Sequence, residues 1–229
     1  MHLRNWQQNF IDEFPSVVKK YRRFIVKAPT GAGKTVLASE IIDRFYKGKK
    51  IIVLCHRLVL LEQLHTALSH KHVVRKLEVS DAGPAFEDYD ILLSTSLRAK
   101  EVLSDAIAKA DVIIIDEAHR VSPNGKGYKR ILDTFEERGK TNAPLIGLTA
   151  SPERRTGDQR DQLNLAFDAI IDCANIEDLI DEGVLVKPIY RPHFVHDLNL
   201  ASIEISSGDF PIEKLSNAII RSSMIDYSI

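Results

Sequence analysis

Two short stretches of this sequence bring together residue types that bind phosphate and metal ions. The first is A-P-T-G-A-G-K-T, residues 28–35, in which Ala28 stands where the usual phosphate-loop pattern has glycine. Gly31 and Gly33 allow the backbone to curl around a phosphate. Lys34 would neutralise the β and γ phosphates, and the Thr35 hydroxyl is suited to Mg²⁺. The stretch predicts an ATP·Mg²⁺ site lined by Pro29, Thr30, Gly31, Ala32, Gly33, Lys34 and Thr35.

The second stretch begins with two adjacent carboxylates, Asp116 and Glu117, followed by Ala118 and His119. It comes directly after four aliphatic residues, 112–115, which are typical of a buried central strand. Ionised carboxylates at that position cost desolvation energy unless a cation compensates them. We therefore expect Asp116 to orient Mg²⁺ and Glu117 to polarise the attacking water. A helix N-cap with an acidic first turn is the alternative interpretation.

Alternating strands and helices must position these two stretches. Residues 24–26 predict a buried strand that leads into the phosphate loop, and the apolar spacing after Lys34 predicts a helix. Further buried strands are expected at 51–55, 91–93, 112–115 and 144–148, with helices between them. This order predicts an α/β fold with a doubly wound, mostly parallel sheet.

The ends of the chain carry weaker periodicity. An amphipathic helix is expected over 3–20, with Pro15 breaking it. Strands are expected at 73–79, 169–173 and 184–186, and a short helix at 176–181. The polar residues that close two buried strands, Arg57 after 51–55 and Ser94-Thr95-Ser96 after 91–93, fit either phosphate contacts or helix-start interactions.

Composition narrows the class of protein. The chain has 229 residues, a mass of 25.8 kDa and a net charge of −1, which suits one large domain with an appendage and gives no global sign of a polyanion partner. Cys55 and Cys173 lie in apolar runs and are expected to be buried thiols. No signal peptide or membrane-length apolar run is present, so a cytoplasmic protein is expected. Three histidines are expected on a wet helix end rather than at a metal site: His65, His70 and His72.

Six motifs follow one another along the chain. They are Leu3-Arg4-x-Trp6-Gln7, Ala28 to Thr35, Cys55-His56-Arg57, Ser94-Thr95-Ser96-Leu97, Asp116-Glu117-Ala118-His119 and Thr149-Ala150-Ser151-Pro152. Together they resemble the first motor domain of DEAH-type superfamily-two helicases and translocases, a resemblance that covers the chain from Leu3 to about Pro188. The phrases at 146–152 and 180–188 look most like the RadD-like and type III restriction-subunit-like branch.

The resemblance implies a RecA-like P-loop NTPase domain over residues 1–188 and a C-terminal extension, 189–229, that leads toward a second RecA-like domain. It implies that Gln7 reads the adenine edge with Arg4 nearby. Lys34, Asp116, Glu117 and His119 would then be the catalytic residues, and Thr149 and Ser151 would couple the nucleotide to the nucleic-acid face. The implied backbone contacts are Arg57, Ser94, Thr95 and Ser96.

The resemblance also implies an ATP-dependent helicase or translocase that uses ATP and Mg²⁺ and binds nucleic acid, with DNA favoured over RNA. Such motors need a second RecA-like domain, in cis or in trans, whose arginines reach the γ-phosphate. Nothing after Pro188 resembles it, so the chain alone is expected to hydrolyse ATP weakly. The alternative is a nucleotide-gated nucleic-acid or protein binding module without efficient turnover. A P-loop kinase is disfavoured by Trp6-Gln7 and Thr149-Ala150-Ser151.

Overall fold

A seven-stranded parallel sheet forms the centre of the fold. The computed structural model describes residues 2–55, 58–77, 89–95, 104–121, 128–152, 163, 165–189, 214 and 216. Within these residues the strand order is β3-β4-β2-β5-β6-β1-β7, and every neighbouring pair is parallel. The strands are β1 (Arg23–Lys27), β2 (Ile51–Cys55), β3 (Val74–Lys76), β4 (Ile91–Thr95), β5 (Val112–Asp116), β6 (Leu145–Thr149) and β7 (Ala169–Asp172).

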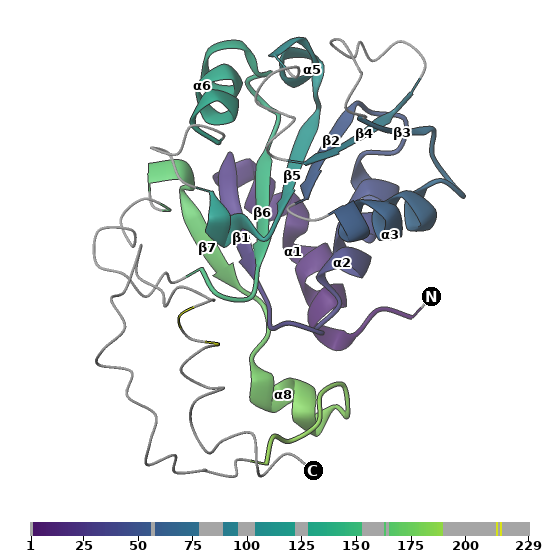
Figure 1. Cartoon of the computed structure of the whole chain (residues 1–229), viewed down its shortest axis with the longest axis vertical. Helices are drawn as coiled ribbons and strands as arrows, with labels where there is room; N and C mark the ends of the chain where they lie inside the picture. Colours follow the sequence, from purple (N-terminus) through teal and green to yellow (C-terminus); the bar gives the residue numbers. More distant parts are fainter. Residues whose placement is uncertain are drawn as a thin grey trace. The chain divides into compact units, whose positions relative to one another are not determined.

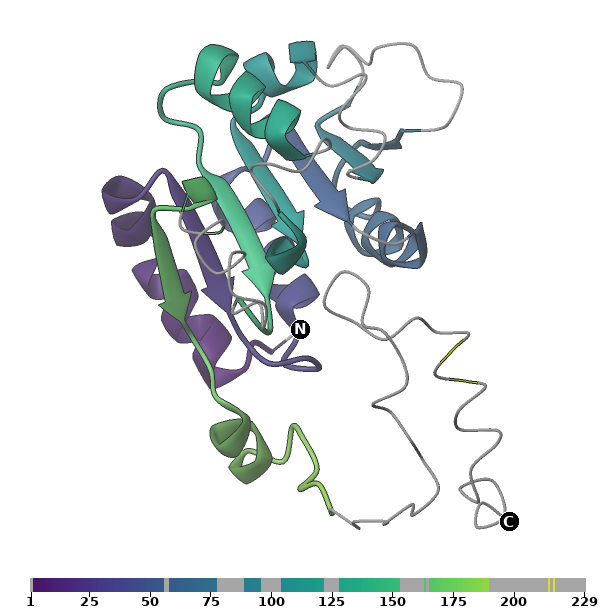
Figure 2. The same cartoon turned by 60° about the vertical axis from the view of Figure 1, so that its left-hand side comes forward.

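Helices cover both faces of this sheet, as Figures 1 and 2 show. One face packs against α1 (Asn5–Lys20), α2 (Lys34–Phe45) and α3 (Leu58–Leu68), and the other against α5 (Ser104–Lys109) and α6 (Tyr128–Arg138). The turn η1 (Ala118–Arg120) and the helix α8 (Ile176–Asp181) complete the described elements. The expected doubly wound α/β fold is confirmed, with all seven strands parallel rather than most of them.

Alternation along the strands explains the two apolar layers. In β1, Phe24 and Val26 belong to the layer under α1 and α2, whereas Ile25 belongs to the layer under α6. All three are fully buried, as expected for strands whose two faces are both covered. The central strands β2 and β6 are likewise buried along their whole length, so the sheet provides a rigid support for the loops at its carboxyl edge.

Two expectations about the chain ends were wrong. The helix α1 continues through Pro15, although proline lacks the N–H that the helix would use at that position. Phe10, Ile11 and Phe14 are almost fully buried on the inner face of α1, and this packing compensates for the lost hydrogen bond. Residues 184–186 form no strand; they belong to a turn in which Val184 and Leu185 both donate backbone N–H groups to the Leu179 carbonyl.

Other expectations are refined. Cys55 is buried and Cys173 half-buried, both as free thiols, and burial raises the pKa of each to about 12. The His72 side chain does not lie on a wet surface: it is 2% exposed and its Nε2 is 2.6 Å from Asp43 Oδ1. No described helix is both long and apolar enough to cross a bilayer. The chain divides into two compact units, residues 1–186 and 187–229, and the site described below lies within the first.

Candidate functional site

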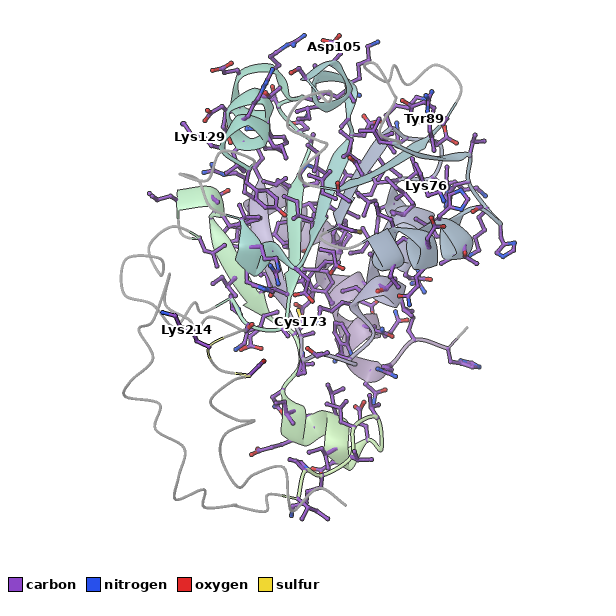
Figure 3. The ribbon with its side chains drawn as sticks, in the orientation of Figure 1. Lys76, Tyr89, Asp105, Lys129, Cys173 and Lys214 are labelled. Atoms are coloured by element: carbon purple, nitrogen blue, oxygen red, sulfur yellow. The ribbon has the colours of Figure 1, made fainter. Side chains whose placement is uncertain are left out.

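The strand order places the two chemical stretches at one edge of the sheet. The phosphate loop follows β1 and the carboxylates end β5, and the single strand β6 lies between them. Neighbouring strands are about 4.8 Å apart, so the ends of β1 and β5 are about 10 Å apart, a gap that one triphosphate spans. This is the carboxyl edge of a parallel sheet, where open α/β folds bind their ligands. In Figure 3 the label Cys173 lies near this carboxyl edge, in the lower part of the view, and the labels Asp105 and Lys129 lie toward the other end of the sheet.

The phosphate loop has the conformation that its glycines predict. Gly31 has φ +80° and Gly33 has φ +97°, values that residues with a Cβ rarely adopt. Gly33 is also the N-cap of α2, so the unpaired N–H groups and the positive dipole end of that helix lie at the loop. The strand, loop and helix context that makes such a sequence an anion site is therefore present.

Three side chains from the start of α1 hold the carbonyls of this loop. Arg4 Nη1 donates to Gly31 O and Ala32 O, at 2.9 and 2.5 Å. The Trp6 indole N–H donates to Ala32 O at 3.3 Å, and Gln7 Nε2 donates to Gly33 O at 2.9 Å. Because the N–H of a trans peptide points opposite to its C=O, holding these carbonyls turns the following N–H groups of Gly33 and Lys34 away from α1.

Gln7 has a structural role in addition to the predicted adenine contact. Its Oε1 accepts the Arg4 backbone N–H at 2.9 Å, which closes the start of α1, and its side chain is almost completely buried. A Cβ at position 33 would lie 2.7 Å from Gln7 Nε2, so the amide would have to move, and the φ of +97° would strain any residue other than glycine there. The adenine contact of Gln7 and Arg4 stays a prediction.

Lys34 is held inside the loop by two backbone carbonyls. Its Nζ donates to Ala28 O at 3.0 Å and to Pro29 O at 3.1 Å. Burial lowers the pKa of Lys34, and the negative charges of Glu117 and Asp116 act in the opposite direction. Lys34 and the two carboxylates are therefore close enough for their charges to interact, and their role in one nucleotide site stays a prediction.

Burial disfavours the charged form of Asp116, as it does that of Lys34. Burial raises the pKa of Asp116, and the neighbouring Glu117 charge raises it further, while Lys34 and a backbone hydrogen bond oppose the shift. An ionised carboxylate at this position is therefore undercompensated in the absence of a ligand. A divalent cation would supply the missing positive charge.

The donor set fits Mg²⁺. Asp116 ends β5 and Thr35 begins α2, both supply oxygen, and Mg²⁺ in nucleotide sites usually takes one or two protein oxygens together with phosphates and water. Among the described residues no group of three or more His, Cys, Asp or Glu side chains is arranged to hold a metal ion by itself.

The turn after β5 lies unusually close to β6. A Cβ at Gly147 would lie 2.7 Å from Ala118 Cβ, so only glycine allows η1 to pack on the sheet at this point. Glu117 has φ +53°, the only positive φ of a non-glycine residue among those described. Such backbone strain persists only where surrounding packing imposes it, and it occurs often at active sites.

His119 connects the acidic turn to β6. Its Nδ1 is 2.9 Å from Thr149 Oγ1 and 3.1 Å from Glu117 Oε2, and the Ser151 backbone N–H donates to Thr149 Oγ1 at 3.3 Å. The two residues expected to couple the site to the nucleic-acid face, Thr149 and Ser151, thus contact each other, and Thr149 also contacts the predicted catalytic residue His119. For Ser151 the contact is made by the main chain.

The expected nucleic-acid contacts are only partly described. The Ser94 side chain is fully buried and its hydroxyl donates to Thr95 O at 3.1 Å, whereas Thr95, at the end of β4, is half-buried. A contact between Ser94 and a nucleic-acid backbone would therefore have to use the main chain of Ser94. Arg57 and Ser96 lie outside the described residues.

Sequence reasoning did not identify three residues that contact the phosphate loop or the start of α1. Trp6 was noted in a motif but given no role. Leu185 packs against Gly31, and Glu182 Oε1 accepts from Asn5 Nδ2 at 3.0 Å. The phrase at 180–188 includes Leu185 but leaves position 182 unspecified, and neither residue was assigned a role from the sequence.

The sequence is similar to a protein family and to curated proteins. A family model described as "Type III restriction enzyme, res subunit" matches residues 1–154. The putative helicase 22 of Sulfolobus islandicus filamentous virus is 29% identical over 176 residues, covering 71% of this chain and 30% of that protein. The type I restriction enzyme EcoAI endonuclease subunit of Escherichia coli is 31% identical over 142 residues, covering 57% of this chain and 17% of that subunit. The chain spans less than a third of either relative.

Solved structures share the fold. The Hef helicase domain of Pyrococcus furiosus superposes with a TM-score of 0.56 at 24% identity, covering 73% of this chain and 37% of that one. The SWI2/SNF2 ATPase core of Sulfolobus solfataricus, determined with double-stranded DNA, gives 0.54 at 21% identity, covering 66% and 32%. At these identities the match shows the RecA-like P-loop NTPase architecture.

Six of the seven parallel strands, the glycine loop at the start of α2 and the acidic turn beside β6 lie in the segment that the family model matches, and only β7 of the described strands lies beyond it. We conclude that the chain belongs to the family of type III restriction enzyme res subunits and carries the RecA-like domain of its helicase motors.

Proposed function

We propose that this chain binds ATP·Mg²⁺ and is the first motor lobe of an ATP-dependent nucleic-acid translocase or helicase. One observation carries the proposal: Lys34 at the start of α2 and Asp116 at the end of β5 lie on either side of β6 at one edge of the sheet, and burial displaces the pKa of both. A positive and a negative side chain whose charges are each only partly compensated favour a ligand that carries both negative and positive charge. A magnesium-bound triphosphate is such a ligand.

Each residue then has a defined task. The amides of the phosphate loop and the Lys34 ammonium bind the phosphates, and the ammonium leaves the Ala28 and Pro29 carbonyls to do so. Thr35 and Asp116 hold Mg²⁺, which supplies charge neutralisation at the β and γ phosphates when bound. Glu117 accepts hydrogen bonds from the attacking water and orients it.

His119 and Thr149 transmit the state of this site. A change in the Glu117 carboxylate alters a partner of His119 Nδ1, and His119 in turn contacts the Thr149 hydroxyl on β6. Since Ser151 N–H donates to the same hydroxyl, the segment after β6 can respond to the nucleotide. We propose that this segment and main-chain groups near Thr95 face the nucleic-acid backbone, and that a second RecA-like domain supplies arginines to the γ-phosphate.

Nucleotide binding is tested by calorimetric titration of the chain with Mg·ATP. We expect Lys34→Ala to weaken binding by at least tenfold, because the variant loses the cation that meets the β and γ phosphates. Glu117→Gln should keep the affinity within about threefold and abolish hydrolysis in any assembly that turns over. Lys129→Ala, on the exposed side of α6, is the matched control and should bind as the unmodified chain does. Equal affinity of Lys34→Ala and Lys129→Ala would contradict the proposal.

A further inference from the structure

The turn that follows α8 touches the phosphate loop, and nothing described so far gives it a role. It consists of residues 182–185, directly after a helix of six residues. Its sequence belongs to the phrase 180–188 that the motor chemistry above does not use. The turn and the loop it touches both lie in the first compact unit.

Hydrogen bonds fix the shape of this turn. The Asn175 side chain accepts the Asp178 backbone N–H at 2.8 Å and starts α8. Gly183 has φ +69°, and the N–H groups of Val184 and Leu185 both reach the Leu179 carbonyl, at 2.8 and 2.9 Å. Leu179 is 1% exposed and belongs to the core layer under α1 and α2. The backbone of Leu185 is therefore attached to a core residue, and its partly buried side chain packs against the same core layer.

The turn makes two contacts with the nucleotide site. Leu185 Cδ2 lies 3.2 Å from the point where a Cβ of Gly31 would be, so the leucine packs directly on the bare backbone of the loop. Glu182 Oε1 accepts a hydrogen bond from Asn5, the first residue of α1, whose next residues hold the loop carbonyls. One contact is thus direct and the other acts through the start of α1.

The loop needs such support because its glycines are intrinsically free. Gly31 and Gly33 have many conformations available, and the anion-binding arrangement is only one of them. The side chains of Arg4, Trp6 and Gln7 hold the carbonyls, but all three come from one helix. Leu185 provides a contact from a separate element and restricts the space into which Gly31 can move.

We propose that Leu185 and the turn 182–185 are a positioning element of the nucleotide site, which keeps the phosphate loop in its binding conformation. The inference rests on the proposed function, since it concerns the affinity of the same site. Leu185 touches the loop and not the reacting atoms. The apparent affinity for nucleotide falls when the competent loop conformation is less populated.

The test is calorimetric titration of the whole 229-residue chain with Mg·ADP, in parallel with thermal unfolding. Leu185→Ala should weaken binding by about threefold to tenfold, and Leu185→Met, which refills the contact, should restore it. Val74→Ala removes carbon from a half-buried side chain on β3, far along the sheet order, and controls for general loss of stability. It should lower the unfolding temperature without changing the affinity. Val186→Ala, at a side chain that is 90% exposed, should change neither quantity.

Two results would overturn the inference while leaving the proposed function intact. One is an affinity of Leu185→Ala within twofold of the unmodified chain. The other is an equal loss in Leu185→Ala and Val74→Ala, which would assign the effect to stability alone. If the unmodified chain binds neither Mg·ADP nor Mg·ATP, the proposed function fails and the inference fails with it.

Discussion

At the scale of single residues, the site places charges where burial disfavours them. Lys34 loses basicity and Asp116 gains it, because each is removed from water while its partner compensates only in part. Groups displaced in this way are characteristic of functional sites, where stability is given up for ligand binding. The unliganded chain should therefore become more stable when one of these charges is removed.

We predict that Asp116→Asn raises the unfolding temperature of the ligand-free chain at neutral pH by about 2–4 °C, or about 1 kcal/mol. The native pKa of Asp116 lies above its unfolded value, so its ionisation destabilises the native state as the pH rises through that native pKa. The gain should vanish below the ordinary pKa of 3.8, where Asp116 is protonated in both states.

Calorimetric scans with and without Mg·ATP measure this trade-off. The variant should gain stability alone and lose the further stabilisation that Mg·ATP gives the unmodified chain. An Asp116→Asn variant that is less stable at neutral pH without ligand would refute the assignment of an undercompensated carboxylate.

At the scale of elements, one ion-paired cluster joins two segments that flank the sheet. Asp43 near the end of α2 contacts both Lys71 and His72, which lie in the turn between α3 and β3. Burial acts to raise the pKa of Asp43, but the hydrogen bonds and charges of Lys71 and His72 outweigh it, and the net shift is downward. The cluster thus stabilises the native chain where Asp43 is ionised.

We expect Asp43→Asn to cost about 1 kcal/mol at neutral pH in urea unfolding. Since the native pKa of Asp43 is lowered, its contribution is fully present above the unfolded pKa and is lost as the pH falls through the native one. The difference between the two proteins should therefore shrink as the pH falls below about 5.

Asp133→Asn is the control for this prediction. Among the described contacts Asp133 has one ion pair, with Lys129 one turn away on the exposed face of α6. Its cost should stay within about 0.5 kcal/mol. A cost of Asp43→Asn that does not depend on pH would show that the carboxylate charge is not what joins these segments.

The elements also show where the sequence was sufficient. The aliphatic runs that form β1, β2, β4, β5 and β6 can be recognised by their length and by the polar residues that follow them. The parallel sheet then brings residues 28–35 and 116–119 to one edge. The helical periodicity of residues 3–20 was a correct guide, but the expectation that Pro15 would break the helix was wrong, because the burial of Phe10 and Phe14 that supports the helix is a tertiary effect.

Contacts between distant parts of the chain were beyond such reasoning. Asn5 and Glu182 are 177 positions apart, and the local sequence around either residue does not predict the hydrogen bond between them. The close packing of η1 on Gly147 is similar: the glycine was visible in the sequence, but the Ala118 methyl group that requires it was not. His72 was expected in water because its partner Asp43 comes from a different helix.

At the scale of the whole molecule, the curated relatives are much longer than this chain, which covers 30% and 17% of the two described above. We propose that catalysis needs a second RecA-like domain facing Lys34 and Glu117. An arginine supplied from such a domain is worth about 10³ to 10⁵ in turnover. The chain alone should therefore bind nucleotide measurably but hydrolyse it slowly.

We predict that supplying the second RecA-like domain of a family member, fused or in trans, raises steady phosphate release by at least about 100-fold. Single-stranded DNA should raise it further, because the closed arrangement of two lobes binds the strand. The same assembly with Glu117→Gln is the control and should remain at background. Tight ATP binding with no response to the second domain or to DNA would instead indicate a nucleotide-gated binding module.

The hydrogen bond between the Trp6 indole and the Ala32 carbonyl has an optical consequence. The sequence contains one tryptophan, so every photon of tryptophan emission from this protein originates beside the phosphate loop. The chromophore is almost fully enclosed, and its N–H contacts a peptide group whose neighbours would bind phosphate. We therefore expect occupancy of the loop to change the tryptophan emission of the unlabelled chain.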